Sequence, residues 1–451
     1  MPDTFITTPY PPGPKGNLLI TSRKELQHDI LGLLQRNVAN YPRICRMKIG
    51  PNHFVNVSDP ELVEKVFVDS ENFGKGKENF KMRFLLGLGL LTNEGKFWLK
   101  QRRLIQPLFH KQRLEGFVQS ISKCTKEMVD DWDKANMPVK DVHAEMTKVT
   151  LAIVSQTLMS KDASGGFQQI NDALGTLMKG LTRRNRELVT LPYWVPTPAN
   201  LKMKRERKMI WDRVYGIIAD RRNDPGQYDD LLSMLLEVED ADTNERMSDE
   251  QIKDEVVTIY LAGHETTANA MSFALYLLAH HPEARKRIAE EYRAAVDADG
   301  KLSYQGLTKL EYTTRVIKES MRLYPPAWGI IRETLHNTTL GGYKLKKGDV
   351  VALAPYAVHR IPEYWPNPEA FDPDRFLPER IKLQHKYTYF PFGGGARLCI
   401  GNNFAMMEMQ VLLAIMCSRY SFATTPATKL ELEALITLRP KGKLILEVKK
   451  G

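Results

Sequence analysis

The stretch FGGGARLCIG, residues 392–401, decides the fold of this chain, because it sets Cys399 in a glycine-rich turn directly before an apolar segment with helical spacing. A helix that starts just after a cysteine points its free N–H groups and positive dipole end at the sulfur, which favours the thiolate. The glycines let the backbone approach another group closely. We therefore expect Cys399 to be a metal ligand or a nucleophile, and the competing interpretation is a buried structural cysteine.

The pattern around this cysteine is F-x-x-G-x-R-x-C-x-G, with Phe392, Gly395, Arg397, Cys399 and Gly401 at its fixed positions. A chance match to so many positions is rare, so the motif outweighs the structural interpretation. It is the haem-ligand signature of the cytochrome P450 family of haem-thiolate monooxygenases, and this chain resembles that family over essentially its whole length.

The resemblance implies a mainly α fold with small β-sheets, in which haem lies between a long distal helix and the proximal cysteine loop. It also implies haem b, bound non-covalently with its iron ligated by Cys399. Phe392 would then pack beside the thiolate, and Arg397 and Gly401 would bind the cofactor. The implied enzyme is a monooxygenase that activates O2 with electrons from a separate redox partner and hydroxylates a hydrophobic small molecule.

The composition is that of an ordinary globular protein, with 451 residues, 43% hydrophobic and 26% charged. No Ser/Gly-rich linker or long charge block divides the chain, so we expect a single haem domain over residues 1–451 and no fused reductase. An external ferredoxin or flavodoxin system is then the electron donor. The four cysteines are scattered without a C-x-x-C pair, which favours a reducing compartment, and we expect a cytoplasmic protein.

The N-terminus carries no apolar run long enough for a signal peptide or a membrane span, so we expect a soluble protein without an integral membrane anchor. The Pro-Pro-Gly-Pro element at residues 11–14 resembles the hinge that follows the anchor in microsomal family members, and a removed anchor stays an open alternative. The net charge of +10 suits an acidic redox partner. Because no nucleic-acid-binding motif accompanies this charge, nucleic acid is not an expected partner.

Sequence periodicity predicts two short strands, over residues 44–49 and 53–57, followed by a long helical region. Beyond that region it predicts a strand over residues 343–351. The tail, residues 430–448, reads as a hairpin that turns at residues 440–442.

A capping box, Ser248 with Gln251 three residues later, predicts the start of a helix that runs to His281, where Pro282 stops it. At roughly 1.5 Å per residue this helix is about 50 Å long. Its apolar faces predict that it is central and buried. In its middle stands the polar patch AGHETT, residues 262–267.

The polar patch places Glu265 where burial is costly unless the carboxylate has a partner or a purpose. One interpretation is a helix kink with a satisfied glutamate. The patch also matches the family's A/G-G-x-D/E-T segment, and the resemblance makes Glu265 and Thr266 the catalytic pair that delivers protons for oxygen activation. We expect His264, at the variable position, to be a hydrogen-bonding helix residue. Ala262 cannot form the ester through which some relatives attach haem.

Glu319 and Arg322 stand at i and i+3, so they share a helical face, and alone they would be a common surface pair. The resemblance joins them to Arg375 of the segment FDPDRF in a buried ion network. Its implied role is in folding and haem retention, not in chemistry.

Trp98 and Arg102, at i and i+4, also share a helical face, from which both can meet a carboxylate. The resemblance makes that carboxylate a haem propionate. Arg332 and Arg397 resemble the other propionate-binding arginines of the family, and for Arg332 the match rests on spacing alone.

The helix predicted around Trp98 carries a second, basic face, roughly 150° away from the first, at Lys96, Lys100 and Arg103. We expect this face to dock the electron donor. The alternative is a basic face that is merely solvated.

The substrate pocket is expected to draw its walls from apolar residues near the haem, among them the loop over residues 80–91. The candidate pocket residues are Phe84, Leu88, Ala262, Trp328, Ile330 and Ile436. An apolar pocket implies a fatty acid, terpenoid, steroid-like or aromatic substrate. The segment GLGLLT, residues 87–92, and the distal glutamate look closer to fatty-acid hydroxylase-like branches than to camphor-type bacterial ones.

Two alternative functions remain open. One is a peroxide-driven haem oxygenase of the same fold, and the other is a non-catalytic haem-binding protein. Members of the first class usually lack the acid–alcohol pair, and the second has no need of it. Glu265 and Thr266 therefore count against both.

Overall fold

The computed structural model describes residues 10–18, 22–50, 52–76, 81–135, 137–160, 167–186, 191–224, 226, 228–240 and 242–451. Phe80, at the start of the predicted pocket loop, lies outside these ranges. The chain forms two compact units. Unit 1 comprises Met1–Glu78, Thr314–Asn402 and Leu432–Arg439, and unit 2 comprises Asn79–Thr313, Asn403–Glu431 and Pro440–Gly451. That the chain is a single haem domain stays a prediction.

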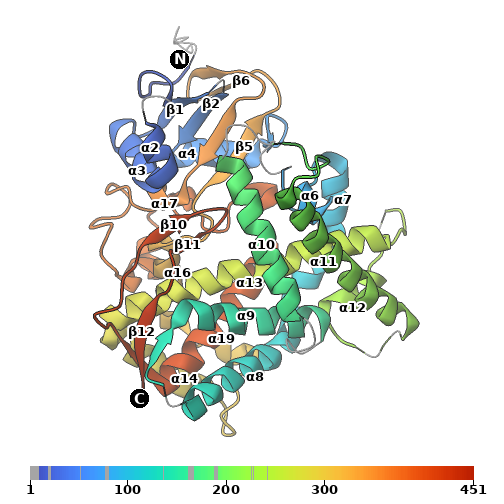
Figure 1. Ribbon diagram of the computed structural model, residues 1–451. Coiled ribbons are helices and arrows are strands. Elements are labelled where there is room, and N and C mark those ends of the chain that lie inside the picture. The colour runs from blue at the N-terminus through green and yellow to red at the C-terminus, as the bar shows by residue number, and fades with distance from the viewer. Residues whose placement is uncertain are drawn as a thin grey trace. The chain divides into compact units, whose positions relative to one another are not determined.

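Unit 1 contains a five-stranded sheet of order β1-β2-β8-β5-β3. Figure 1 labels three of these strands, β1, β2 and β5. β1 (Ile44–Ile49) and β2 (Asn52–Val57) form an antiparallel pair, which confirms both predicted strands. β2 runs parallel to β8 (Val350–Leu353). β5 (Ile330–Thr334) lies antiparallel between β8 and β3 (Phe73–Lys75). The β-branched residues of these strands alternate into a buried apolar core.

Unit 1 also contains short helices. They are α2 (Arg23–His28), α3 (Ile30–Asn40), α4 (Pro60–Val68), α17 (Pro355–Val358) and α18 (Pro378–Ile381), with the 3-10 turns η2 (Pro373–Phe376), η3 (Lys386–Thr388) and η4 (Gly395–Arg397). α4 begins where the carboxylate of Asp59 accepts the first free N–H groups and Pro60 occupies the first helical position. α4 packs against η3 and η4, so it supports the turn before Cys399.

Two small hairpins pair β6 (Thr338–Leu340) with β7 (Tyr343–Leu345), and β10 (Leu432–Ala434) with β11 (Leu438–Pro440). The single strand predicted over residues 343–351 is wrong, because the chain turns between β7 and β8 at Gly348, where φ is +89°. The tail hairpin exists, but its predicted turn at residues 440–442 is wrong, since the chain already turns at residues 435–437.

Unit 2 is mainly helical. Its helices are α6 (Arg83–Leu86), α7 (Gly95–Ile105), α8 (Lys111–Ala135), α9 (Val142–Met159), α10 (Phe167–Arg186), α11 (Pro198–Asn223), α12 (Leu231–Glu237), α13 (Asp249–His280), α14 (Pro282–Ala295) and α15 (Tyr304–Leu307), with the 3-10 turn η1 (Gln106–Phe109). α16 (Glu311–Leu323) and α19 (Asn402–Arg419) each contain a boundary between the units.

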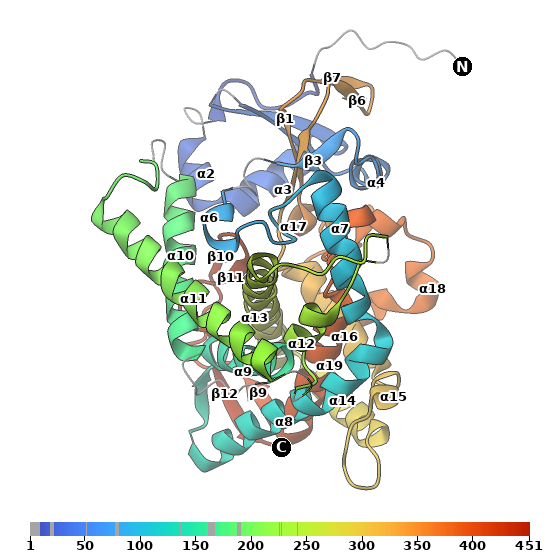
Figure 2. The ribbon, with the colours of Figure 1, turned by 90° about the vertical axis from the view of Figure 1, so that its right-hand side faces the viewer.

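The capping box predicted for α13 is confirmed. Ser248 accepts the backbone N–H of Gln251 at 3.3 Å, and the Gln251 side chain accepts the N–H of Ser248 at 2.8 Å. The helix runs for 32 residues, and Pro282 opens the next helix. Figure 2 looks along α13, which packs against α9, α11 and α12 and is buried over most of its length.

A three-stranded sheet of order β4-β12-β9 completes unit 2, formed by β4 (Val139–Asp141), β12 (Ile445–Lys450) and β9 (Tyr420–Ala423). The predicted mainly α fold with small sheets is therefore confirmed. Among the helices of the described ranges, none combines the length and the apolar character needed to span a membrane.

Candidate functional site

Cys399 lies in unit 1, between η4 and the start of α19 at Asn402. Its backbone N–H donates to the carbonyl of Phe392 at 3.0 Å and closes the loop. Gly393 and Gly395 have φ angles of +76° and +63°, which residues with a side chain rarely adopt. The local sequence thus fixes the loop and holds the cysteine at the N-terminal end of a helix.

The glycines of this loop also allow close packing. A Cβ on Gly395 would overlap the backbone oxygen of Phe67, at the end of α4, and a Cβ on Gly394 would collide with the rings of Phe67 and Tyr387. The loop therefore lies directly against the core of unit 1. This contact explains why three glycines stand together here.

The four cysteines differ in their surroundings. Cys45, Cys124 and Cys417 are buried, whereas Cys399 is exposed. Burial raises the pKa of Cys45 and of Cys417 to about 12, so both remain thiols at neutral pH. An exposed thiol at the start of a helix can ionise and bind a metal ion. The residues around Cys399 therefore fit an iron-bearing cofactor.

Unit 1 also holds two of the predicted cofactor-binding arginines. Arg332 on β5 is buried, and Arg397 in η4 is half-buried. The guanidinium of Arg332 lies 5.6 Å from the centre of the Phe67 ring, which packs against the cysteine loop. Ile330, a predicted pocket residue on the same strand, lies beside Gly393. Unit 1 thus brings the cysteine loop, Arg332 and Ile330 together around Phe67.

Trp328 and Ile436, two further predicted pocket residues, are joined by the turn between β10 and β11. The indole N–H of Trp328 donates to the carbonyl of Leu435 at 3.0 Å. The N–H of Leu438 donates to the carbonyl of Pro326 at 2.9 Å. These bonds fasten the turn that carries Ile436 to the segment that carries Trp328.

The structure brings Glu319, Arg322 and Arg375 together in unit 1. The side chains of Glu319 and Arg322 are fully buried and share two parallel hydrogen bonds of 2.7 and 2.8 Å. Arg375 lies 3.4 Å from the same carboxylate, which also accepts the N–H of Asp372. The other N–H groups of Arg322 donate to the carbonyls of His359, Pro368 and Ala370. Burial raises the pKa of Glu319, and the bonds from Arg322 oppose that rise.

The middle of α13, in unit 2, is accessible although the helix is buried on both sides. Ala262 is exposed, and Glu265 and Thr266 are half-buried, between buried Leu261 and buried Thr267. The helix continues through this stretch, so the structure shows no break there. The hydroxyl of Thr266 donates to the carbonyl of Ala262 at 2.7 Å. The side chains of this accessible polar stretch can therefore contact a group that binds beside α13.

His264 points away from this accessible stretch into the helix packing, and only 5% of its surface is exposed. Its Nδ1 donates to the carbonyl of Tyr260 at 2.8 Å, because a carbonyl can only accept. Burial lowers the pKa of His264, so the ring is neutral. The residue is therefore a hydrogen-bonding helix residue, as expected.

Sequence reasoning missed Glu408, a carboxylic acid within the apolar α19. Glu408 is 2% exposed and hydrogen-bonds to Thr267, which follows Thr266 on α13. Burial raises its pKa to about 8, so the carboxyl group is mostly protonated at neutral pH. The signal in the sequence was a single acid inside the apolar run that follows the cysteine.

Trp98 and Arg102 lie one turn apart on α7 in unit 2. Trp98 is buried, whereas Arg102 is half-buried and donates from Nε to the side chain of Gln106 at 3.1 Å. Both side chains thus occupy the helical face that the spacing predicts. Of these two residues, Arg102 is the more exposed to solvent.

Two buried carboxylates of α13 hold the segment between α6 and α7 that carries Leu88. The N–H of Leu88 donates to Asp254 at 2.8 Å, and the N–H of Leu90 donates to Glu255 at 2.9 Å. Asp254 and Glu255 are 4% and 1% exposed. A Cβ on Gly87 would overlap the Asp254 carboxylate, so this approach depends on glycine. No local sequence pattern predicts these contacts, which join residues 165 and 166 positions apart.

Phe84 contacts an aromatic residue that precedes α11 and a cation on α11. Its ring stacks on Tyr193 with 3.8 Å between ring centres, and the Arg207 guanidinium lies 4.3 Å from the Phe84 ring centre. Trp211 lies one turn beyond Arg207 on α11. The ammonium group of Lys253 lies 3.8 Å from the centre of the Trp211 ring. Lys253 also pairs with Asp254 at 2.5 Å. The two predicted pocket residues of this segment, Phe84 and Leu88, are thus held by α11 and α13.

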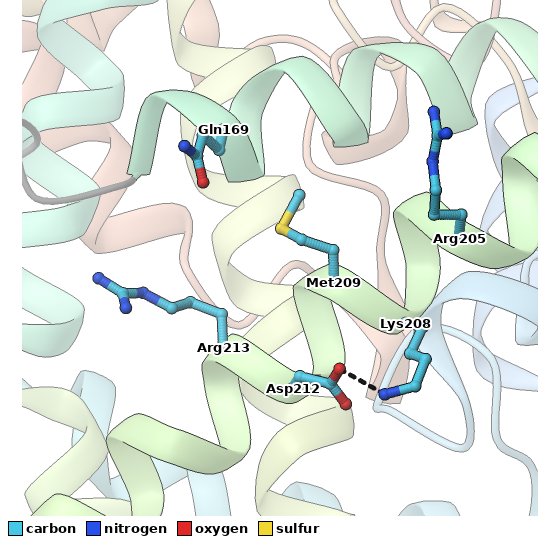
Figure 3. A pocket seen from close by; sticks show the side chains of 6 residues that line it. All are labelled: Gln169, Arg205, Lys208, Met209, Asp212 and Arg213. Atoms are coloured by element: carbon cyan, nitrogen blue, oxygen red, sulfur yellow. Dashed lines mark hydrogen bonds and ion pairs between the residues drawn. The ribbon is translucent and has the colours of Figure 1, made fainter.

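A cavity of about 520 Å³ lies along α10 and α11 in unit 2 (Figure 3). It is lined by Gln169, Arg205, Lys208, Met209, Asp212 and Arg213. Lys208 and Asp212 form an ion pair of 2.6 Å. Because its lining is mostly charged and includes none of the predicted pocket residues, this cavity does not suit a hydrophobic substrate.

The whole chain is similar to known proteins in sequence and in fold. Residues 11–446 match the family model described as cytochrome P450. Cyclooctatin synthase of Streptomyces melanosporofaciens is 33% identical over 420 residues, which cover 92% of this chain and 89% of that protein. Pentalenene oxygenase of Streptomyces avermitilis is 32% identical over 410 residues, or 90% of each chain. The crystal structure of the cytochrome P450DA haem domain superposes with a TM-score of 0.89, at 26% identity, over 98% of both chains.

Proposed function

The chain belongs to the cytochrome P450 family of haem monooxygenases and binds haem non-covalently with cysteine-ligated iron, and we propose that Cys399 is the ligand. The observation that carries this assignment is the exposed thiol of Cys399 in a glycine-shaped loop before α19, while the other cysteines are buried. When bound there, haem supplies the reduction of O2 at iron, with a thiolate ligand that favours O–O cleavage.

The cofactor's carboxylates are assigned to Trp98 and Arg102 on α7 and to Arg332 and Arg397 in unit 1. An indole N–H and three guanidinium groups are hydrogen-bond donors that suit carboxylates. Phe392 is assigned to packing beside the sulfur of Cys399, where it tunes the donor strength of the thiolate, and Gly401 is assigned to cofactor binding. Because Ala262 has no carboxylate, no ester to the cofactor forms at that position.

Glu265 and Thr266 are assigned to proton delivery. The Thr266 hydroxyl donates to the carbonyl of Ala262, and rotating it away from that carbonyl presents a proton donor to the accessible stretch of α13. The carboxylate of Glu265, one residue earlier and half-buried, can restore that proton from solvent.

The substrate that we favour is a terpenoid, one of the four hydrophobic classes expected from the sequence. The names of the relatives cyclooctatin synthase and pentalenene oxygenase support this choice over a fatty acid. The electron donor is assigned to an external ferredoxin or flavodoxin system. Cysteines scattered along the chain without a C-x-x-C pair suit a soluble protein of the reducing cytoplasm.

The test of this function is coupling, measured as oxygenated product formed per reducing equivalent consumed with a panel of terpenoids. The Thr266→Ala variant should keep its haem but lose most of its coupling, because the proton donor is gone. Thr258→Ala is the matched control, since the Thr258 hydroxyl also bonds to the carbonyl four residues earlier, at 2.7 Å. Equal coupling in all three proteins would contradict the role of Thr266.

A further inference from the structure

The basic face of α7 is covered by acidic residues of the same chain. The ammonium group of Lys100 pairs with Glu245, and the guanidinium of Arg103 pairs with Asp242 and, at 2.9 Å, with Asp240. The three acids stand close together between α12 and α13, and we call Asp240, Asp242 and Glu245 the acidic loop. Sequence reasoning predicted that Lys100 and Arg103 dock the electron donor, so the two cations already have carboxylate partners where a donor would supply them.

Hydrogen bonds join the described residues on both sides of the acidic loop. Glu239 and Arg246 form an isolated antiparallel bridge at its base. The N–H of Asp240 donates to the carbonyl of Glu245 at 3.0 Å, and the Asp240 carboxylate accepts the N–H groups of Asp242 and Thr243. These bonds close the loop on itself. The Asp240 carboxylate thus joins the loop backbone to Arg103 of α7.

The three carboxylates differ in how firmly they are held. The side chain of Asp240 is 1% exposed, whereas those of Asp242 and Glu245 are 65% and 64% exposed. Exposed ion pairs contribute little to stability and weaken with salt. Asp242 and Glu245 can therefore be replaced by carboxylates from another molecule, while Asp240 stays in place.

We propose that the acidic loop is an intramolecular competitor of the electron donor. Asp242 and Glu245 occupy Lys100 and Arg103 in the free protein, and an acidic donor protein displaces them when it docks on α7. A donor must then present enough carboxylates, in the right places, to replace two that are already bound. The loop thus weakens binding of every acidic protein and selects for the one whose carboxylates fit best.

The test measures the affinity of an acidic plant-type [2Fe–2S] ferredoxin for the haem-loaded protein at low and at high salt. The double variant Asp242→Asn/Glu245→Gln should bind this ferredoxin about fivefold more tightly at low salt, because two weak exposed pairs no longer compete. The matched control is Glu237→Gln/Glu239→Gln, which removes two exposed acids near the loop, where Glu239 pairs with Arg246 and not with α7. The control should change the affinity by less than about twofold.

A second comparison tests whether the loop variant changes ferredoxin binding through the cations of α7. In a Lys100→Gln/Arg103→Gln background, binding should be weaker, and Asp242→Asn/Glu245→Gln should no longer alter it. Equal tightening by the loop variant and by the control would show a general charge effect and overturn the proposal. Weaker binding by the loop variant would overturn it too, since the loop would then help to present the docking face.

The proposal rests on the proposed function only in that the enzyme needs an acidic protein donor. Binding is measured without turnover, so the two can fail separately. If Cys399 is not the iron ligand, the ferredoxin affinities and their response to the loop variants should stay as described. If the loop variants behave like the control, the assignment of Cys399 is untouched.

Discussion

Two sets of ion pairs, one in each unit, use the same residue types in opposite ways. In unit 1, Glu319 and Arg322 are fully buried, share two hydrogen bonds and accept or donate to several backbone groups. In unit 2, Lys100 and Arg103 meet exposed carboxylates of the acidic loop. Breaking a buried pair leaves a charge in a medium that cannot solvate it, whereas water takes over when an exposed pair opens. Burial therefore makes the first set part of the architecture and leaves the second set free to exchange partners.

The largest effect is expected from Arg322→Ala. This change leaves Glu319 buried without its main partner and three backbone carbonyls without their donor, so unfolding should become easier by about 3–5 kcal/mol. Urea unfolding measures this loss. Arg36→Ala is the control, because Arg36 pairs with Glu25 and Asp29 while 49% exposed, and it should have little effect. If Arg322→Ala and Arg36→Ala unfolded at similar urea concentrations, the buried and the exposed ion pairs would not differ in their contribution to stability.

A smaller loss is expected from Asp254→Asn, which tests the buried contacts that hold the Leu88 segment. The change weakens the bond to the Leu88 N–H and leaves the buried ammonium group of Lys253 without a carboxylate. The free energy of unfolding should fall by roughly 2 kcal/mol, and the amide of Leu88 should exchange faster with solvent. Hydrogen exchange measures the second effect. Unchanged exchange relative to Glu250→Gln, an exposed acid of the same helix, would mean that Asp254 does not hold the segment.

The buried Glu408 predicts a pH dependence. Its pKa is about 8 in the folded protein and near the ordinary value of 4.5 when unfolded, so the folded state binds the extra proton between these values. This contribution to stability is complete below pH 4.5 and is lost as pH rises toward 8. Between pH 5 and pH 7 it should amount to roughly 2 kcal/mol. In thermal unfolding, Glu408→Gln should lose less stability than the natural protein between pH 5 and pH 7. If the stabilities of the two proteins changed equally with pH, the raised pKa of Glu408 would be contradicted.

The smallest effect on stability belongs to the exposed set. Asp242→Asn/Glu245→Gln should leave the melting temperature within about 1 °C of the natural protein, because exposed ion pairs contribute little. Differential scanning calorimetry at low salt checks this. A large drop in melting temperature would mean that the acidic loop stabilises the fold, as the buried ion network of unit 1 does.

Local sequence signals predicted much of this molecule. The capping box set the start of α13, alternation set β1 and β2, and the cysteine motif located the loop before α19. The predictions failed where a turn at Gly348 split the strand predicted over residues 343–351, and where the tail turned earlier than its proline and glycine suggested.

Contacts between distant segments were beyond these signals. Asp254 and Glu255 read as ordinary helix acids, and only the fold shows that they accept N–H groups from the Leu88 segment. The partners of Lys100 and Arg103 lie more than one hundred residues away, so the sequence could identify a basic face but not the acids that cover it.

The central claim is that Cys399 supplies the thiolate that ligates the haem iron. The most direct test is the carbon-monoxide difference spectrum of the reduced protein, compared with Cys399→Ser and with Cys417→Ser, a change at a buried cysteine. We expect the far red-shifted Soret band of thiolate-ligated haem in the natural protein and in Cys417→Ser, and its loss in Cys399→Ser. A band that survives in Cys399→Ser, or that is absent from the natural protein, would contradict the claim.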